Sequence, residues 1–160
     1  MTIKVGDKMP SATLYEMGEG GPKAVSTDEL FKGKTVVLFG VPGAFTPTCS
    51  AKHLPGYVEQ SAAIKAKGAD EIVCMSVNDA FVMSAWGKDQ NTGDKVRMVA
   101  DGSAELTKKM GFELDLAPRG LGMRGRRFSM VVKDGVVSAL NLEEGGAFEV
   151  SAADRIIAQI

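Results

Sequence analysis

The alternation of apolar and polar residues along the chain predicts strands and helices that follow one another in a regular order. Residues 35–41 form a short run that is apolar on both faces, as in a central strand of a sheet covered by helices. Residues 71–77 and 96–100 are two further apolar runs of strand length. Between these strands the apolar positions recur at helical spacing. We expect helices from Cys49 to Gly68, over 79–90 with Asn78 or Asp79 as the cap, and over 103–110.

The two ends of the chain are predicted to add hairpins. Residues 2–25 contain short apolar pieces broken by several glycines and a proline, which is typical of a small hairpin with a loose turn. Residues 127–133 and 136–142 are two strand-like runs joined through an Asp-Gly pair, a strong hairpin signal. Residues 112–125 are rich in Gly and Arg, and we expect an ordered loop there.

Two short helices complete the pattern. Residues 26–31 resemble a capped helical turn that ends before Gly33, and Ser151 is expected to cap a last helix over 152–160. Strand–helix alternation followed by a hairpin and a helix indicates an α/β fold with a mixed sheet. We therefore expect one domain over residues 1–160, with a thioredoxin-like fold, a mixed central sheet flanked by helices, and an N-terminal β-hairpin.

The charge balance narrows the classes of function. The chain has 19 Lys and Arg and 20 Asp and Glu, and its net charge is −1. A basic excess is absent, so nucleic-acid binding and binding to anionic membranes are not expected. The local cluster of Arg124, Arg126 and Arg127 needs its own explanation. No apolar run is long enough to span a bilayer.

The N-terminus and the cysteine content predict a cytoplasmic protein. The first ten residues lack an apolar core followed by a small-residue cleavage site, as well as the Arg- and Ser-rich character of a transit peptide. A chain already trimmed of a presequence would look the same. Two cysteines, Cys49 and Cys74, are too few for a disulfide framework, and a reducing compartment is the simpler interpretation.

Cys49 occupies an unusual position for a structural cysteine. Thr46 is a good N-cap residue and Pro47 suits the first helical position, so Cys49 falls in the first turn of a helix, which Pro55 should then kink. The helix dipole there favours negative charge, and a thiol should ionise more easily. Cys74 lies instead within an apolar strand, and we expect it to be buried and not bonded to Cys49.

Several kinds of cysteine chemistry remain open at this point. A dithiol oxidoreductase needs a second cysteine close by, but Ser50, Ala51 and Lys52 follow Cys49. A Cys–His protease would need His53 as its base, although a packing role for this histidine is also open. A zinc site would have three soft ligands at most, and we expect no metal or other cofactor. Peroxide reduction requires fewer parts: a thiolate, and donors for the departing oxygen.

A longer set of motifs makes the chain recognisable. Pro42, Thr46 and Cys49 have the spacing Pro-x-x-x-Thr-x-x-Cys, within the segment FGVPGAFTPTCSAKHLPGY. This segment resembles the active site of the peroxiredoxins, in particular their type II, or peroxiredoxin-five-like, branch. The segments SVNDAFVMSAWGK, ADGSAELTKKMG and RRFSMVV are similar to the same branch. The resemblance covers nearly the whole chain.

The resemblance implies a thiol peroxidase that acts on hydrogen peroxide and small organic hydroperoxides. It implies that Cys49 is the nucleophile and that Thr46 hydrogen-bonds the thiolate and the peroxide. It also implies that Pro42 shields the sulfur and helps to position the backbone of Gly43 and Ala44, which would bind the peroxide. The family's active-site arginine corresponds to Arg127, which would hold the thiolate and polarise the peroxide. We then expect the other two arginines of the cluster to point into water.

The resemblance also has implications for partners. Some members of this branch carry a resolving cysteine in the region that matches residues 141–151, where this chain has none. An outside thiol, glutathione with glutaredoxin or thioredoxin, would then regenerate Cys49, with Cys74 as an internal alternative. The family also implies a homodimer formed through loops around the site, where Phe45, Met83 and Trp86 are candidate contacts. A redox sensor or chaperone of the same fold, and a thiol–disulfide exchanger, are the rival functions.

Overall fold

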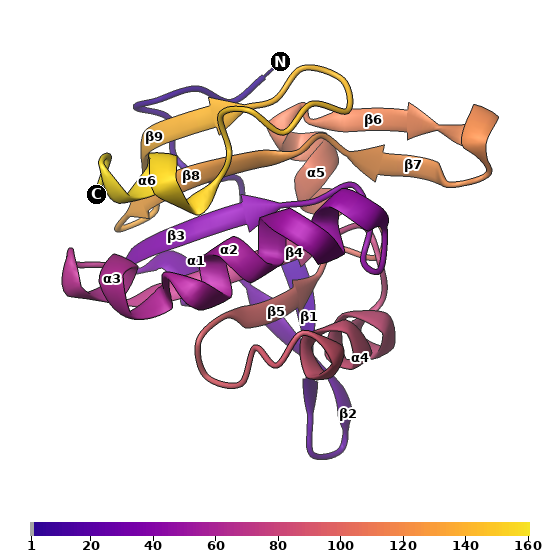
Figure 1. Cartoon of the computed structure of the whole chain (residues 1–160), viewed down its shortest axis with the longest axis horizontal. Helices are drawn as coiled ribbons and strands as arrows, with labels where there is room; N and C mark the ends of the chain where they lie inside the picture. Colours follow the sequence, from indigo (N-terminus) through magenta and orange to yellow (C-terminus); the bar gives the residue numbers. More distant parts are fainter. Residues whose placement is uncertain (1) are drawn as a thin grey trace.

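Seven strands form one mixed sheet through the centre of the protein, whose computed structural model describes residues 2–160 (Figure 1). The strands are β1 (Thr13–Gly18), β2 (Gly21–Ser26), β3 (Thr35–Gly40), β4 (Glu71–Ser76), β5 (Arg97–Ala100), β8 (Phe128–Lys133) and β9 (Val136–Leu142). Their order is β2-β1-β5-β4-β3-β8-β9. β3 and β4 are parallel, as are β4 and β5, and the other pairs are antiparallel. This is the expected thioredoxin-like arrangement, including the N-terminal hairpin of β1 and β2.

Helices cover both faces of the sheet (Figure 1). The α-helices are α1 (Thr27–Phe31), α2 (Leu54–Glu59), α3 (Ser61–Ala66), α4 (Ala80–Asp89), α5 (Glu105–Met110) and α6 (Ala153–Ile157). In β3, Val37 and Phe39 pack with α2, α3, α4 and α6, whereas Val36 and Leu38 pack with α1 and α5. All four of these β3 side chains are fully buried. The run of apolar residues on both faces therefore identified the central strand correctly.

The predicted helix caps are partly confirmed. Asp79 accepts a hydrogen bond from the Val82 backbone N–H at 2.8 Å, and Ser26 accepts one from the Glu29 N–H at 3.1 Å. Ser151 does not cap α6: its hydroxyl donates to Glu143 Oε2 at 2.7 Å, and Ala152 occupies the cap position without a side-chain bond. The reason is that α6 begins at Ala153, so Ser151 lies one residue before the cap position, and its hydroxyl bonds to the Glu143 carboxylate.

The ordered loop expected over residues 112–125 is wrong. Strands β6 (Glu113–Leu116) and β7 (Gly122–Gly125) form a separate antiparallel hairpin, joined by a 3₁₀ turn, η2 (Ala117–Arg119). The hairpin projects from the side of the molecule (Figure 1). Its strands have four residues each and one of them begins and ends with glycine, so the alternation of apolar and polar residues is weak there.

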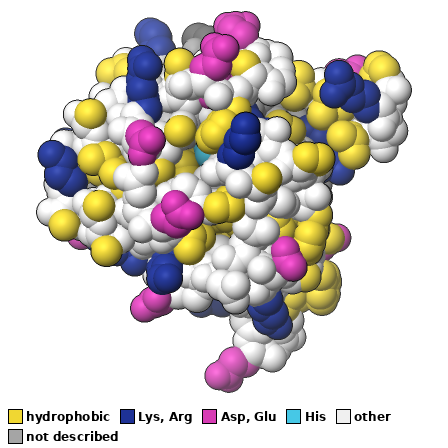
Figure 2. Space-filling model, in the orientation of Figure 1, with side chains coloured by type: hydrophobic (Ala, Val, Ile, Leu, Met, Phe, Trp, Pro, Cys, Tyr) yellow, Lys and Arg dark blue, Asp and Glu magenta, His cyan; other side chains and the backbone are white. Residues whose placement is uncertain are grey.

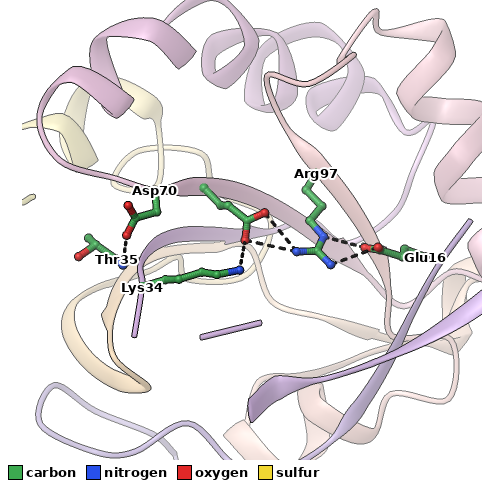
Figure 3. A network of polar contacts seen from close by, with 6 residues as sticks. Glu16, Lys34, Thr35, Asp70 and Arg97 are labelled. Carbon is green, nitrogen blue, oxygen red and sulfur yellow. Dashed lines mark hydrogen bonds and ion pairs between the residues drawn. The ribbon is translucent and has the colours of Figure 1, made fainter. Parts of the chain in front are cut away.

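An ion-pair network ties the N-terminal hairpin to the central strands (Figure 3). Arg97 donates to Glu16 at 2.7 Å and to Glu71 at 3.1 Å, and Lys34 lies 3.3 Å from the same Glu71 carboxylate. The hydrogen bond from Arg97 to Glu16 is the main cause of the raised pKa of Arg97, and it outweighs partial burial. Asp70 accepts from the Thr35 N–H at 2.8 Å beside this network. These contacts join β1, β4 and β5 and the residues at the starts of β3 and β4.

The surface is mixed in charge. On the face in Figure 2, basic and acidic side chains alternate with apolar ones and form no patch of a single sign. Within residues 2–160, no helix has the length and apolar character that a membrane crossing requires. In the same range, no three His, Cys, Asp or Glu side chains gather in a way that would hold a metal ion.

Candidate active site

Cys49 lies in the first turn of a helical segment, at the carboxyl end of β3. This segment begins at Pro47 and continues as a π-helical turn, η1 (Cys49–His53), in which the Leu54 N–H donates to the Cys49 carbonyl five residues back. Pro55 has no N–H and leaves the carbonyl four residues before it without its α-helical donor, which favours the wider turn. Instead of a kinked helix, the chain forms η1, α2 and α3 in succession. The Cys49 side chain is fully buried.

Thr46 stands at the start of this helical segment, but its hydroxyl does not cap it. The Thr46 carbonyl accepts from the Ser50 N–H at 2.9 Å, while Thr46 Oγ1 donates to the Gly43 carbonyl at 2.6 Å. The hydroxyl therefore closes the turn before the helix. No hydrogen bond joins Thr46 to Cys49 within residues 2–160. The expected bond to the sulfur is not formed in this structure, although the hydroxyl oxygen keeps its capacity to accept.

Arg127 is the polar partner of the Cys49 sulfur. It immediately precedes β8, is 4% exposed, and its Nη2 donates to Cys49 Sγ at 3.3 Å across 78 residues of sequence. Its Nη1 lies 2.9 Å from His53 Nδ1. Its Nε is buried and has no partner among the described residues. The guanidinium thus holds the sulfur and one ring, and retains a free donor at the site.

His53 is buried between Arg127 and a backbone carbonyl. Its Nε2 lies 3.1 Å from the Ser151 carbonyl. Burial, and then the charge of Arg127, lower the pKa of His53 to about 3, against the opposing effect of the Ser151 carbonyl. The ring is therefore neutral at physiological pH, with its proton on Nε2, so Nδ1 accepts from Arg127. Both ring nitrogens are engaged, and His53 is not placed as the base of a Cys–His pair.

The turn that contains Pro42 is held from the β6–β7 hairpin. Arg124 Nη1 donates to the Pro42 carbonyl at 3.1 Å, and its Nε donates to the Leu121 carbonyl at 2.9 Å. A Cβ atom at Gly43 would lie 2.7 Å from Arg124 Nη1, so only glycine fits there without a shift. The Ala44 N–H donates to Asn78 Oδ1 at 3.0 Å. The backbone of Gly43 and Ala44 is thus fixed by two distant side chains.

The expectation that Arg124 and Arg126 point into water is wrong. Both are half-buried, and Arg126 donates to the Glu143 carbonyl at 2.8 Å, as Arg124 does to Pro42. Backbone carbonyls that face these side chains attract the guanidinium donors. Of the three arginines only Arg127 bonds to the sulfur, as expected. It immediately precedes β8, and Cys49 packs on the same side of the sheet as Val131, opposite Phe128.

A cavity of about 470 Å³ opens next to the site. Pro42, Thr46 and Arg127 line one side of it. Three leucines line another side, and all come from the β6–β7 hairpin and its turn: Leu114, Leu116 and Leu121. Cys49 does not line this cavity, and its side chain is fully buried.

Cys74 behaves as the structural cysteine that its strand predicts. It is fully buried in β4, and neither it nor Cys49 forms a disulfide. Burial raises the pKa of the Cys74 thiol well above its usual range; the nearby Cys49 adds to this and the Arg127 charge opposes it. The thiol therefore stays protonated, as expected for an inert core cysteine.

Of the three candidate dimer contacts, two are core residues. Met83 is 1% exposed and Trp86 is fully buried, with its Nε1 donating to Ser50 Oγ at 3.0 Å. They face the sheet from α4 because the apolar side of an amphipathic helix packs inward. Phe45 is 52% exposed and has a left-handed φ of 64°.

Sequence reasoning missed four residues that organise the site: Asn78, Arg124, Glu143 and, in its real role, His53. Glu143 accepts from three backbone N–H groups and a hydroxyl, and Asn78 was considered only as a possible helix cap. The one available signal was a helical one: His53 lies four residues after Cys49, and residues at that spacing share a helix face.

A thioredoxin-like sheet that sets a buried cysteine beside an arginine defines a thiol-based oxidoreductase. A model of the Redoxin family matches residues 4–157. Peroxiredoxin-2E-2, chloroplastic, from Oryza sativa subsp. japonica is 53% identical over 98% of this chain and 72% of its own length. Peroxiredoxin-2E, chloroplastic, from Arabidopsis thaliana is 51% identical over 98% of this chain and 68% of its own length.

A solved structure supports the same family. Reduced Prx3 from Vibrio vulnificus, in complex with H₂O₂, is 50% identical, with a TM-score of 0.94 and 98% of both chains covered. The chain belongs to the peroxiredoxins, within the Redoxin family, and to their type II branch. It is accordingly a thiol-dependent peroxidase with a thioredoxin-like fold.

The expectation of a cytoplasmic protein is contradicted by these relatives. The two plant proteins with 53% and 51% identity are chloroplastic. The composition of the first ten residues carried that expectation. It is a poor guide because the composition of ten residues does not by itself determine a compartment.

Proposed function

We propose that Cys49 is the peroxidatic nucleophile and that Arg127 is the catalytic residue that stabilises the reacting atoms. The Cys49 thiolate attacks one peroxide oxygen, and a new S–O bond forms while the O–O bond breaks. The sulfur is oxidised by two electrons to a sulfenic acid, and the departing oxygen takes a proton and leaves as water or an alcohol. The observation that carries this proposal is the donation from Arg127 Nη2 to Cys49 Sγ at 3.3 Å.

The residues around the sulfur support roles for the peroxide oxygens. Arg127 Nε is a buried donor without a partner within residues 2–160, so a peroxide oxygen at the site would satisfy it. Thr46 Oγ1 has used its one hydrogen on the Gly43 carbonyl, which leaves its oxygen to accept from the peroxide O–H. Pro42 forms the wall over the sulfur. The Ala44 N–H already donates to Asn78 Oδ1, so it is not a free donor for the peroxide. Gly43 and Ala44 therefore contribute by shaping the wall.

The buried position of Cys49 has a consequence for the reductant. A thiol as large as glutathione cannot reach a fully buried sulfur until the helical segment at η1 opens. An outside thiol then attacks the sulfenic sulfur, water leaves, and a second thiol releases reduced Cys49 and a disulfide. We propose glutathione with glutaredoxin, or thioredoxin, as the source, because residues 141–151 hold no cysteine.

The test of the nucleophile compares the two cysteines. Cys49→Ser should abolish peroxide consumption, because the attacking sulfur is removed. Cys74→Ser is the matched control and should largely preserve it, since the Cys74 thiol is buried and protonated. Equal losses in both variants would contradict a mechanism with one catalytic cysteine. Parallel assays with glutathione plus glutaredoxin and with thioredoxin identify the reductant.

We further propose that residues 1–160 act as a single domain, that two copies form a homodimer, and that the plastid is the compartment. Phe45, 52% exposed next to the site, and Phe81, 62% exposed on α4, are apolar side chains that would be covered in a dimer. Sedimentation should give the mass of a dimer for the wild type and that of a monomer for Phe45→Glu. Equal masses for the two proteins would contradict a dimer contact at Phe45. The chloroplastic relatives support the compartment.

A further inference from the structure

The segment after β9, residues 143–151, returns across the site and is folded around one carboxylate. Glu143 is 2% exposed, and its Oε2 accepts from the backbone N–H groups of Glu149 at 2.8 Å, Val150 at 2.8 Å and Ser151 at 2.9 Å. The Ser151 hydroxyl donates to the same oxygen at 2.7 Å. Four donors converge on one oxygen and close the segment into a loop, which we call the latch segment.

The backbone of Glu143 fixes the latch segment to the start of β8. The Glu143 N–H donates to the Arg127 carbonyl at 2.9 Å, and the Glu143 carbonyl accepts from Arg126 Nη2 at 2.8 Å. Glu143 therefore binds both ends of this arrangement. Its carboxylate accepts from residues 149–151 at the end of the latch segment, and its backbone N–H donates to the Arg127 carbonyl.

The latch segment ends at the carbonyl that orients His53. The Ser151 carbonyl accepts from His53 Nε2 at 3.1 Å and from the Tyr57 hydroxyl at 2.8 Å. Phe148, within the segment, has its ring centroid 5.0 Å from that of His53 and 5.6 Å from Arg127 Cζ. The guanidinium is thus held by an oriented imidazole on one nitrogen and covered by an aromatic ring from the same loop.

The ionisation of Glu143 suits this role. Burial acts to raise the pKa of Glu143, but the hydrogen bonds from the Ser151 hydroxyl and from the backbone N–H groups of Val150, Ser151 and Glu149 outweigh it, and the pKa is lowered. The carboxylate is charged at physiological pH, when its four bonds are strongest.

We infer that the latch segment positions Arg127 for its action on Cys49, with Glu143 and His53 as its positioning residues. The path runs from the Glu143 carboxylate to the Ser151 carbonyl, to the His53 ring and to Arg127 Nη1. This inference rests on the proposed function, because it takes Arg127 as the group that acts on the sulfur. It also gives a use to the region in which the sequence has no resolving cysteine.

The informative change is Glu143→Gln, which keeps the side chain's shape. An uncharged amide oxygen accepts the four bonds now made to Oε2 more weakly than a carboxylate does, so the Ser151 carbonyl and the His53 ring are held less firmly in place. Because small misplacements of catalytic groups are costly, we expect the rate constant for peroxide reduction to fall about tenfold to a hundredfold. Glu19→Gln is the matched control: it makes the same change at an exposed glutamate between β1 and β2, outside the latch segment. Its rate should equal that of the wild type.

The assays use the full chain in the Cys74→Ser background, so that Cys49 is the only thiol. Stopped-flow kinetics give the rate with peroxide, and iodoacetamide alkylation of Cys49 over a range of pH reports how well Arg127 holds the sulfur. Support requires a slower peroxide step and a shifted alkylation profile in Glu143→Gln, with neither change in Glu19→Gln. The double variant Glu143→Gln, His53→Ala should be no slower than the slower single variant, because both act on one path.

The outcomes separate this inference from the proposed function. If Arg127→Ala is slow while Glu143→Gln keeps the wild-type rate and alkylation profile and only melts earlier, the latch segment is a structural tie and the inference is overturned alone. If Arg127→Ala keeps the wild-type rate, the proposed function fails and the inference fails with it. Should Glu143→Gln not fold, Ser151→Ala removes one of the four donors, and an unchanged alkylation profile in that variant overturns the inference.

Discussion

Acidification is expected to destabilise the protein through His53. This residue is the single histidine of the chain and is buried with a pKa of about 3. A second ring proton would have to sit on Nδ1, which at present accepts from Arg127 at 2.9 Å. Protonation therefore breaks a hydrogen bond and brings two cations together, whereas in the unfolded chain the ring takes up the proton freely.

The sign and size follow from the two pKa values. In the unfolded chain a histidine titrates near pH 6.5, so between this pH and about 3 the unfolded state binds more protons than the folded state. The free energy of unfolding therefore falls as the pH falls through that window. For one group with these values, the loss from about pH 7.5 to about pH 5 is about 2 kcal/mol. Most carboxylates titrate below this range.

The measurement is urea unfolding at both pH values, followed by the fluorescence of Trp86, the single tryptophan, whose side chain is fully buried. His53→Gln, in which the titrating group is absent, is the matched variant. The wild type should lose about 2 kcal/mol more than the variant between about pH 7.5 and about pH 5. An equal loss in both proteins would refute the argument that His53 is buried in its neutral form.

Three further changes test the site and the core. Arg127→Ala should slow peroxide reduction about a hundredfold, because a donor to the reacting atoms is lost, and stopped-flow kinetics check this; a wild-type rate would exclude the role. Gly43→Ala should slow the same step and lower the melting temperature, since its Cβ would lie 2.7 Å from Arg124 Nη1; a variant identical to the wild type would show that the turn relaxes freely. Phe39→Ala should cost about 3–5 kcal/mol in urea unfolding, because this buried ring stacks on Tyr57; a loss below about 1 kcal/mol would contradict that packing.

Local patterns were sufficient wherever one element carried its own signal. The apolar run of residues 35–41 identified β3, and Cys49 was placed correctly in the first turn after it. Asp79 caps α4 as expected. The hairpin over residues 112–125 escaped detection because both strands are short and β7 begins and ends with glycine. The same hairpin supplies Arg124 to the Pro42 turn and three leucines to the cavity lining. Because the hairpin was not predicted, these lining residues were not predicted either.

Side-chain partners were predicted less well than positions. Thr46 was placed correctly at the start of the helical segment, but its hydroxyl bonds to the Gly43 carbonyl. Ser151 was placed next to α6, but its hydroxyl bonds to Glu143. In both cases a short polar side chain had several partners within reach, and the choice depended on groups that the local sequence does not bring together.

The sequence by itself determined the order of strands and helices, the two-sided burial of the central strand and the place of Cys49 at a helix start. These features depend on residues a few positions apart, and their periodicity and caps are local. Only the tertiary structure decided that Arg127 meets Cys49 across 78 residues, that His53 lies neutral between them and Ser151, and that Glu143 closes the loop behind it. Such contacts depend on how the sheet and its loops pack in three dimensions, and no spacing along the chain encodes them.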